Sequence, residues 1–152
     1  QEMETVDLWE ITQQAAMRLS GKAEENQVTV RCAGVQASIR GVEYIVDEIV
    51  YNLCENAIKY NKKGGDVKVT VRREGGKSIL TVVDNGIGIP KEDQDRVFER
   101  FYRVDKSHSR KIGGTGLGLS IVKHAVSYLG GEIFLESVEG EGTTVTVTFP
   151  AV

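Results

Sequence analysis

The stretch VEYIVDEIVYNLCENAIKY, residues 42–60, decides the fold class of this chain. Apolar side chains return along it at intervals of three and four residues, which predicts an amphipathic helix with one buried stripe: Val42, Ile45, Val46, Ile49, Leu53 and Ala57. Asn52, Asn56, Lys59 and Tyr60 share a different face of that helix. This polar face is either a solvated surface or a ligand site. It suits a ligand because two amides, a cation and an aromatic ring could bind a metal, a phosphate and a flat base.

The segments on either side of this helix predict the rest of the fold. Alternation of apolar and polar residues indicates half-buried strands, which we expect over residues 28–32, 37–39, 66–73, 78–83, 132–137 and 143–149. Further helices are predicted over residues 5–24, 91–102 and 117–129. This order of elements predicts an α+β fold, a two-layer sandwich in which helices cover one face of a mixed, mostly antiparallel sheet.

Length and composition limit the class of protein. The 152 residues make one domain, with 40% hydrophobic and 27% charged residues, as in ordinary globular proteins. A net charge of −3 argues against a nucleic-acid binder, and no apolar run approaches the roughly 18 residues of a membrane span. Cys32 and Cys54 lie among apolar residues without metal-ligand spacing, so we interpret both as reduced core residues.

Glycines gather at two places in the sequence, which points to backbone that turns tightly or approaches a ligand. The first is DNGIGIP, residues 84–90, at the end of an apolar strand. It is either a β-turn or a site where the Asp84 carboxylate accepts hydrogen bonds from a ligand amine. The second is GGTGLGLS, residues 113–120, which runs into a helix and could bind an anion. It follows a polar loop instead of a strand and lacks the Walker lysine, so neither a dinucleotide fingerprint nor a P-loop is present.

Four motifs in this order resemble the sequence boxes of sensor histidine kinases. Residues 52–60 (NLCENAIKY) resemble the N box, residues 84–89 (DNGIGI) the G1 box, residues 98–103 (FERFYR) the F box and residues 114–119 (GTGLGL) the G2 box. The resemblance implies the Bergerat ATP-binding fold, an α/β sandwich shared with gyrase, mismatch-repair ATPases and a heat-shock chaperone. It implies that the chain binds ATP with Mg²⁺ and transfers the γ-phosphoryl group to a histidine.

The resemblance also implies roles for single residues. Asn56 would ligate the Mg²⁺ bound to the phosphates, because an amide oxygen suits a hard cation. Asn52 would lie near the phosphates, Lys59 would contact a phosphate, and Tyr60 would lie along the adenine or ribose. Asp84 would accept the hydrogen bond of the adenine amino group and so make the base-specific contact.

The glycine clusters and the segment between them would complete the site. Gly86 and Gly88 would admit the nucleotide, and residues 89–113 would form a lid that is mobile without nucleotide. Arg103 in this lid would reach the γ-phosphate. The G2 box would hinge the lid and present backbone amides to the phosphates, through Gly114, Thr115, Gly116, Leu117 and Gly118. Thr143 would lie near the adenine through a bound water.

The implied partner is a dimerisation domain that carries the phosphoacceptor histidine, and through it a response regulator. Residues 1–26 would be the helical segment that leads from that domain. Neither His108 nor His124 has the sequence context of the family's acceptor, so we interpret both as incidental. We expect a cytoplasmic location with the parent protein anchored in the cell membrane, and no contact of this fragment with membrane or nucleic acid.

Two alternatives stay open at this point. One is another ATPase or a serine kinase of the same fold, and the other is a pseudokinase that binds nucleotide without transfer. ATP-hydrolysing relatives place a glutamate where this chain has Asn52, and an amide cannot act as a general base. This difference favours phosphoryl transfer to a protein over hydrolysis, while Asn56 and Asp84 argue against a pseudokinase.

Overall fold

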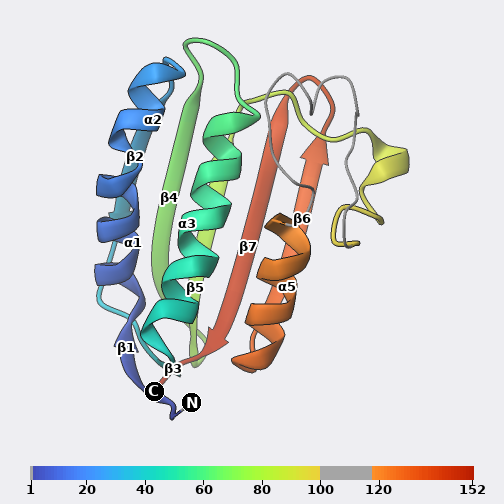
Figure 1. Cartoon of the computed structure of the whole chain (residues 1–152). Coiled ribbons are helices and arrows are strands. Elements are labelled where there is room, and N and C mark those ends of the chain that lie inside the picture. The colour runs from blue at the N-terminus through green and yellow to red at the C-terminus, as the bar shows by residue number, and fades with distance from the viewer. Residues whose placement is uncertain (1, 100–117) are drawn as a thin grey trace.

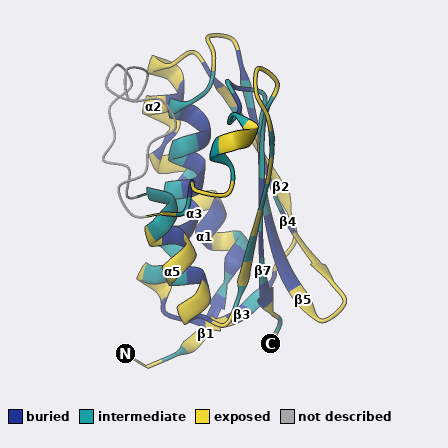
Figure 2. Ribbon diagram, turned by 90° about the vertical axis from the view of Figure 1, so that its right-hand side faces the viewer, coloured by how far each residue is buried: buried dark blue, intermediate teal, exposed yellow. Residues whose placement is uncertain are grey.

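The computed structural model describes residues 2–99 and 118–152, which form two layers. The elements, in chain order, are β1 (Glu4–Asp7), α1 (Leu8–Arg18), α2 (Ser20–Glu25), β2 (Thr29–Gly34), β3 (Ser38–Gly41), α3 (Glu43–Lys59), β4 (Asp66–Glu74), β5 (Lys77–Asp84), the 3₁₀ helix η1 (Lys91–Asp93), α5 (Gly118–Tyr128), β6 (Glu132–Val138) and β7 (Gly142–Pro150). Helices α1, α3 and α5 lie on one face of the sheet (Figure 1), and no described helix covers the other face (Figure 2).

The main sheet has five strands in the order β2-β4-β5-β7-β6. Only the β2–β4 pair among them is parallel, and the other three pairs are antiparallel. The cross-strand register places Val69, Val82, Val145 and Leu135 in one row on the helix-facing side. This arrangement confirms the predicted sandwich with a mixed, mostly antiparallel sheet.

The core lies between the sheet and the central helix α3. The predicted apolar stripe of α3 faces it, with Val46 and Ile49 fully buried and Leu53 2% exposed. Burial of each such side chain contributes about 1.5–3 kcal/mol. Val122 and Val126 of α5 and Leu8 and Ala15 of α1 join the same core. Packing therefore fixes the rotation of α3 and leaves its polar face on the outside.

The N-terminal segment differs from the predicted single helix over residues 5–24. It begins with β1, which pairs with β3 in a separate two-stranded sheet. Asp7 then caps α1, because its carboxylate accepts a hydrogen bond from Trp9 N (3.1 Å), and the same oxygen accepts one from Ala37 N (3.0 Å) just before β3. A turn at Leu19 separates α1 from α2. The pairing of Val6 with Ile39 keeps residues 4–7 extended.

The predicted helix over residues 91–102 is also different in its described part. Only Lys91–Asp93 is helical there, as one 3₁₀ turn, and turns follow it. The backbone bonds from Arg96 N to Asp93 O and from Glu99 N to Arg96 O each span three residues, as in 3₁₀ geometry. The Gln94 amide donates to Ile89 O and to Ser137 O, both at 2.9 Å, which ties the segment to β6 and competes with a regular helix.

The two cysteines have different environments. Cys54 on α3 is buried, and burial raises the pKa of its thiol to about 12. Cys32 lies on β2, which is an edge strand of the main sheet, and it is exposed. The interpretation of both cysteines as core residues was therefore wrong for Cys32, because an edge strand has a neighbouring strand on one side only.

Candidate functional site

The polar face of α3 reaches the loop that follows β5. Asn52, Asn56, Lys59 and Tyr60 are all partly buried, between the core stripe and solvent. The Tyr60 carbonyl oxygen accepts a hydrogen bond from Ile87 N at 3.1 Å. The end of this helix is therefore joined to the G1-like loop. One helical turn before Asn56, the Asn52 side chain donates a hydrogen bond to the Glu48 carbonyl of its own helix at 2.8 Å.

The first turn of α5 lies against Asn56. A β-carbon built on Gly118 would lie 3.4 Å from Asn56 Nδ2 and 3.7 Å from Oδ1, so the amide faces bare backbone. The described part of the G2 box therefore lies beside the N box. The Asn56 oxygen is a suitable ligand for Mg²⁺, and the described residues hold no cluster of three acids, histidines or cysteines for a metal. Phosphate oxygens and waters would supply the remaining ligands, as is usual for this ion.

Asp84 ends β5 and lies opposite Thr143 of β7. Its carboxylate accepts hydrogen bonds from the backbone N–H groups of Gly86, at 2.9 Å, and Thr143. Burial raises the pKa of this carboxyl above its ordinary value of 3.8, although the two hydrogen bonds act in the opposite direction. A partly buried carboxylate held by two backbone amides is a fixed acceptor for one further donor.

Thr143 belongs to a short chain of hydroxyl groups. The Ser137 hydroxyl accepts from Ile89 N at 2.8 Å and donates to the Gly142 carbonyl at 2.9 Å. Thr143 Oγ1 lies 2.8 Å from Ser137 Oγ. Since the single Ser137 proton goes to Gly142, Thr143 is the donor of this contact, and its oxygen keeps its lone pairs for a ligand or a water.

The glycines near Asp84 contact protein backbone at close range. A β-carbon on Gly86 would lie 2.4 Å from the Tyr60 carbonyl oxygen, and one on Gly88, at φ +68°, would lie 2.1 Å from the Val138 oxygen. On Gly142, at φ +139°, it would lie 2.0 Å from the backbone carbonyl oxygen of Asp84. These glycines let the loop after β5 fit between α3 and the β6–β7 turn. The prediction that Gly86 and Gly88 admit a nucleotide stays a prediction.

Part of the predicted site lies outside the described residues. This applies to Arg103 and to Gly114, Thr115, Gly116 and Leu117, and to residues 100–113 of the predicted lid. The described beginning of that segment is hydrogen-bonded to β6 through Ile89 and Gln94. The structure thus brings together Asn56 with Gly118, Asp84 with Thr143, and the G1-like loop with Tyr60.

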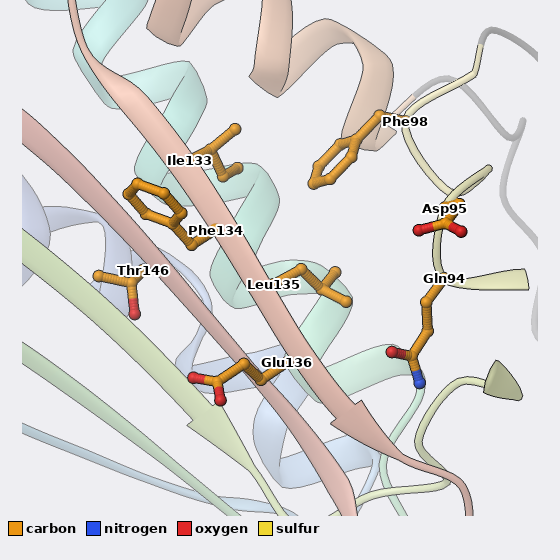
Figure 3. Close-up of a pocket in the computed structure, with 8 residues that line it drawn as sticks. All are labelled: Gln94, Asp95, Phe98, Ile133, Phe134, Leu135, Glu136 and Thr146. Atoms are coloured by element: carbon orange, nitrogen blue, oxygen red, sulfur yellow. The ribbon is translucent and has the colours of Figure 1, made fainter.

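A pocket of about 690 Å³ lies along the outer edge of the sheet, away from Asp84. Figure 3 shows Gln94, Asp95 and Phe98 on one side of it and strand β6 on the other. Residues 133–136 of β6 all line it although their side chains alternate between faces, so the pocket follows the unpaired edge of this strand. Phe98, the first residue of the F-box motif, lies 5.4 Å from the ammonium of Lys123.

Two site residues were missed by the sequence reasoning. Ser137 interrupts the alternation of Ile133 and Leu135 on the helix-facing side of β6, and such a polar residue in an apolar row is a signal for a hydrogen-bonded site. Gly142 stands in the turn sequence EGEG, where nothing distinguishes it from Gly140. Its close approach to Asp84 depends on the pairing of β5 with β7 and is not visible locally.

Comparison with known proteins agrees with this geometry. Residues 41–152 match the family model described as histidine kinase-, DNA gyrase B- and HSP90-like ATPase. The chain belongs to this family. The sensor-like histidine kinase SenX3 of Mycolicibacterium smegmatis is 42% identical over 150 residues, which is 98% of this chain and 39% of that kinase. The chain spans well under two thirds of the length of this and other curated histidine kinases that it matches.

Solved structures of this ATPase family share the whole fold. The mycobacterial sensor histidine kinase MprB has a TM-score of 0.85 and 27% identity, with 98% of this chain and 97% of that chain covered. Full-length ShkA in complex with AMPPNP has a TM-score of 0.84 and 27% identity, with 99% of this chain and 31% of that chain covered. The histidine-kinase resemblance and the Bergerat fold are therefore confirmed. Along nearly its whole length the chain is similar to the matching part of sensor histidine kinases.

Proposed function

We propose that this domain binds Mg²⁺-ATP between α3, α5 and the loop after β5, and transfers the γ-phosphoryl group to a histidine of a separate dimerisation domain. The observation that carries this proposal is the Asp84 carboxylate, held by the amides of Gly86 and Thr143 beside the end of α3. It is a fixed acceptor for the adenine amino group, with Thr143 Oγ1 as an adjacent acceptor. The AMPPNP complex of the related ShkA supports an adenine nucleotide as the ligand.

The polar face of α3 would bind the phosphate end of the nucleotide. Lys59 supplies a cation, Asn56 an oxygen ligand for Mg²⁺, and Tyr60 a ring beside the adenine or ribose. Mg²⁺, when bound, neutralises charge on the phosphates. Asn52 donates to a backbone carbonyl and carries no carboxylate, so it cannot activate a water molecule as a general base. This chemistry favours transfer to a protein acceptor over hydrolysis.

Transfer requires an acceptor placed in line with the γ-phosphate, because positioning and electrostatics supply most of the catalysis. We propose that the acceptor domain docks beside Phe98, where the pocket along β6 offers apolar surface. The response regulator would act through that domain. None of the described helices is both long and apolar enough to cross a membrane, and attachment to the cell membrane through other parts of the protein is part of the proposal.

A transfer assay tests this function. The domain is incubated with radiolabelled ATP and Mg²⁺, with and without the acceptor domain of the parent protein. When both domains are present, we expect acid-labile label on the acceptor domain and none on the ATPase domain. The Phe98→Ala variant of the ATPase domain should give less label, and the Asn56→Ala variant almost none. Label on the isolated chain that is lost in His124→Gln would contradict the proposal that the phosphoacceptor histidine lies in a separate domain. ATP turnover that is unaffected by the acceptor would favour a hydrolase.

A further inference from the structure

The side of α3 that faces α1 and α2 carries a ladder of charged and aromatic residues. Asp47, Tyr51, Glu55 and Lys59 follow one another at intervals of four residues. At its first rung, both terminal nitrogens of Arg18 donate to the Asp47 carboxylate, at 2.8 and 3.0 Å. The Arg18 guanidinium also lies 4.9 Å from the centre of the Tyr51 ring. Cations of the N-terminal helices thus meet the acids of α3.

Glu55 lies between two lysines at the far end of this ladder. Lys22 Nζ donates a hydrogen bond to Oε2, and Lys59 Nζ lies 4.0 Å from Oε1. The Glu55 side chain is only 16% exposed, and a carboxylate removed from water needs a paired cation. The hydrogen bond to Glu55 raises the pKa of Lys22, so Lys22 remains charged at neutral pH.

Lys59 belongs both to this ladder and to the proposed nucleotide face. It follows Asn52 by seven residues, which places it about 20° around the helix from Asn52 at roughly 100° per residue. Its distance of 4.0 Å from Glu55 is longer than a hydrogen bond. Its ammonium is therefore not bound directly to the carboxylate, although that carboxylate is next to it.

We propose that Lys22 is a positioning residue for nucleotide binding: by holding the Glu55 carboxylate, it leaves the Lys59 ammonium available to the phosphates. This inference rests on the proposed function, in which Lys59 contacts a phosphate. Without the Lys22 charge, the partly buried Glu55 has Lys59 as its nearest remaining cationic partner among the described ion pairs. The Lys59 ammonium then pairs with Glu55. The Glu55 carboxylate thus competes with the nucleotide phosphates for the Lys59 ammonium.

Nucleotide affinities of charge variants test this inference, with dissociation constants measured by calorimetry. Lys22→Gln should weaken ATP binding about threefold to fivefold, which is the upper range for partly exposed ion pairs. Lys22→Arg keeps the charge and should bind as the unmodified domain does. The double variant Lys22→Gln/Glu55→Gln should recover most of the loss, because the competing carboxylate is gone.

Two controls separate this effect from loss of structure. Arg18→Gln breaks the ion pair with Asp47, which lies away from Glu55 and Lys59, and should leave the ATP affinity unchanged. Adenosine, which has no phosphate, should bind Lys22→Gln and the unmodified domain equally in a competition assay. An unchanged ATP affinity in Lys22→Gln, no recovery in the double variant, or an equal loss for adenosine would each overturn the inference.

Different results would refute the proposed function and the role of Lys22. If the unmodified domain does not bind ATP, both are wrong. If it binds ATP, and Asp84→Asn weakens that binding while Lys22→Gln does not, the proposed nucleotide site is correct and only the role of Lys22 is refuted.

Discussion

Replacement of Asp84 by asparagine is the sharpest test of the base-binding site, because the structure fixes how the new amide group must lie. The Gly86 N–H donates to Asp84 Oδ1 at 2.9 Å. An asparagine here has one oxygen, and that oxygen must face Gly86 to keep this bond. Its NH₂ group then takes the place of the second carboxylate oxygen. A donor would meet the adenine amino group, which is also a donor.

The expected loss follows from the chemistry of that contact. A hydrogen bond to a charged group contributes about 1.5–3 kcal/mol, so the dissociation constant for ATP should rise about tenfold to one hundredfold. Guanine carries a carbonyl acceptor where adenine carries the amino group. In the variant, the affinity for GTP should therefore fall less than the affinity for ATP, or should rise. The preference for ATP over GTP should decrease.

The same change should not destabilise the domain without nucleotide. Burial raises the pKa of Asp84 above 3.8, so the contribution of this group to stability is fully present below about pH 3.8 and is lost as the pH rises through the raised pKa. At neutral pH the carboxylate is charged, and its partial removal from water lowers the stability of the folded domain. A neutral asparagine removes that cost but accepts more weakly from Gly86 and Thr143, so the melting temperature of Asp84→Asn should stay close to that of the unmodified domain.

Calorimetric titration with ATP and GTP, together with thermal melts of both proteins, measures all three effects. Equal affinities for ATP and GTP, unchanged in the variant, would refute the assignment of Asp84 to the adenine. A large drop in melting temperature would show instead that Asp84 is mainly structural.

Three further predictions concern the surroundings of this carboxylate. Asn56→Ala should remove the Mg²⁺-dependent part of ATP binding and the transfer activity while circular dichroism and melting temperature stay close to those of the unmodified domain, since this side chain lies off the core stripe. Gly142→Ala, at φ +139° with its β-carbon 2.0 Å from the backbone carbonyl oxygen of Asp84, should lower the melting temperature by at least about 6 °C. Gly140→Ala, at φ +84° in open space, is the matched control, and an equal shift would disprove the close packing. Ser137→Ala takes this partner from two partly buried donors, Ile89 N–H and the Thr143 hydroxyl, and from one acceptor, the Gly142 carbonyl. It should cost about 1–3 kcal/mol in urea unfolding, so a neutral result would exclude the hydroxyl chain.

Local patterns predicted the elements whose side chains face one continuous core. Ile49 and Leu53 recur with the helical period, and Val67, Val69 and Val71 alternate, because each set packs on one face. The polar face of α3 could be predicted for the same reason: Asn52 and Asn56 fall outside the buried stripe. These signals are carried within single elements and need no knowledge of the partner element.

Features that depend on distant partners could not be predicted in this way. Strand β1 is four residues long and stays extended through its pairing with β3, more than thirty residues later. A local sign of the boundary was present, since Asp7 followed by Glu10 at the third helical position is a helix N-terminal signature. The tight packing of Gly86 against Tyr60 depends in turn on where the end of α3 lies relative to β5.

The contrast between the two thiols gives this domain a natural attachment point for a spectroscopic probe. Thiolates react with maleimides and thiols do not, so Cys54, buried with a pKa of about 12, is protected in the native fold. Burial raises the pKa of the Cys32 thiol as well, but this side chain is exposed on β2, four strands away from the β6 edge, so a reagent can reach it. The Trp9 ring packs against Gly34 two residues further along that strand, so a fluorophore on Cys32 is close enough to accept energy from this sole tryptophan of the chain. Detachment of α1 from β2 could then be followed optically in the unmodified sequence, without a cysteine being added or removed.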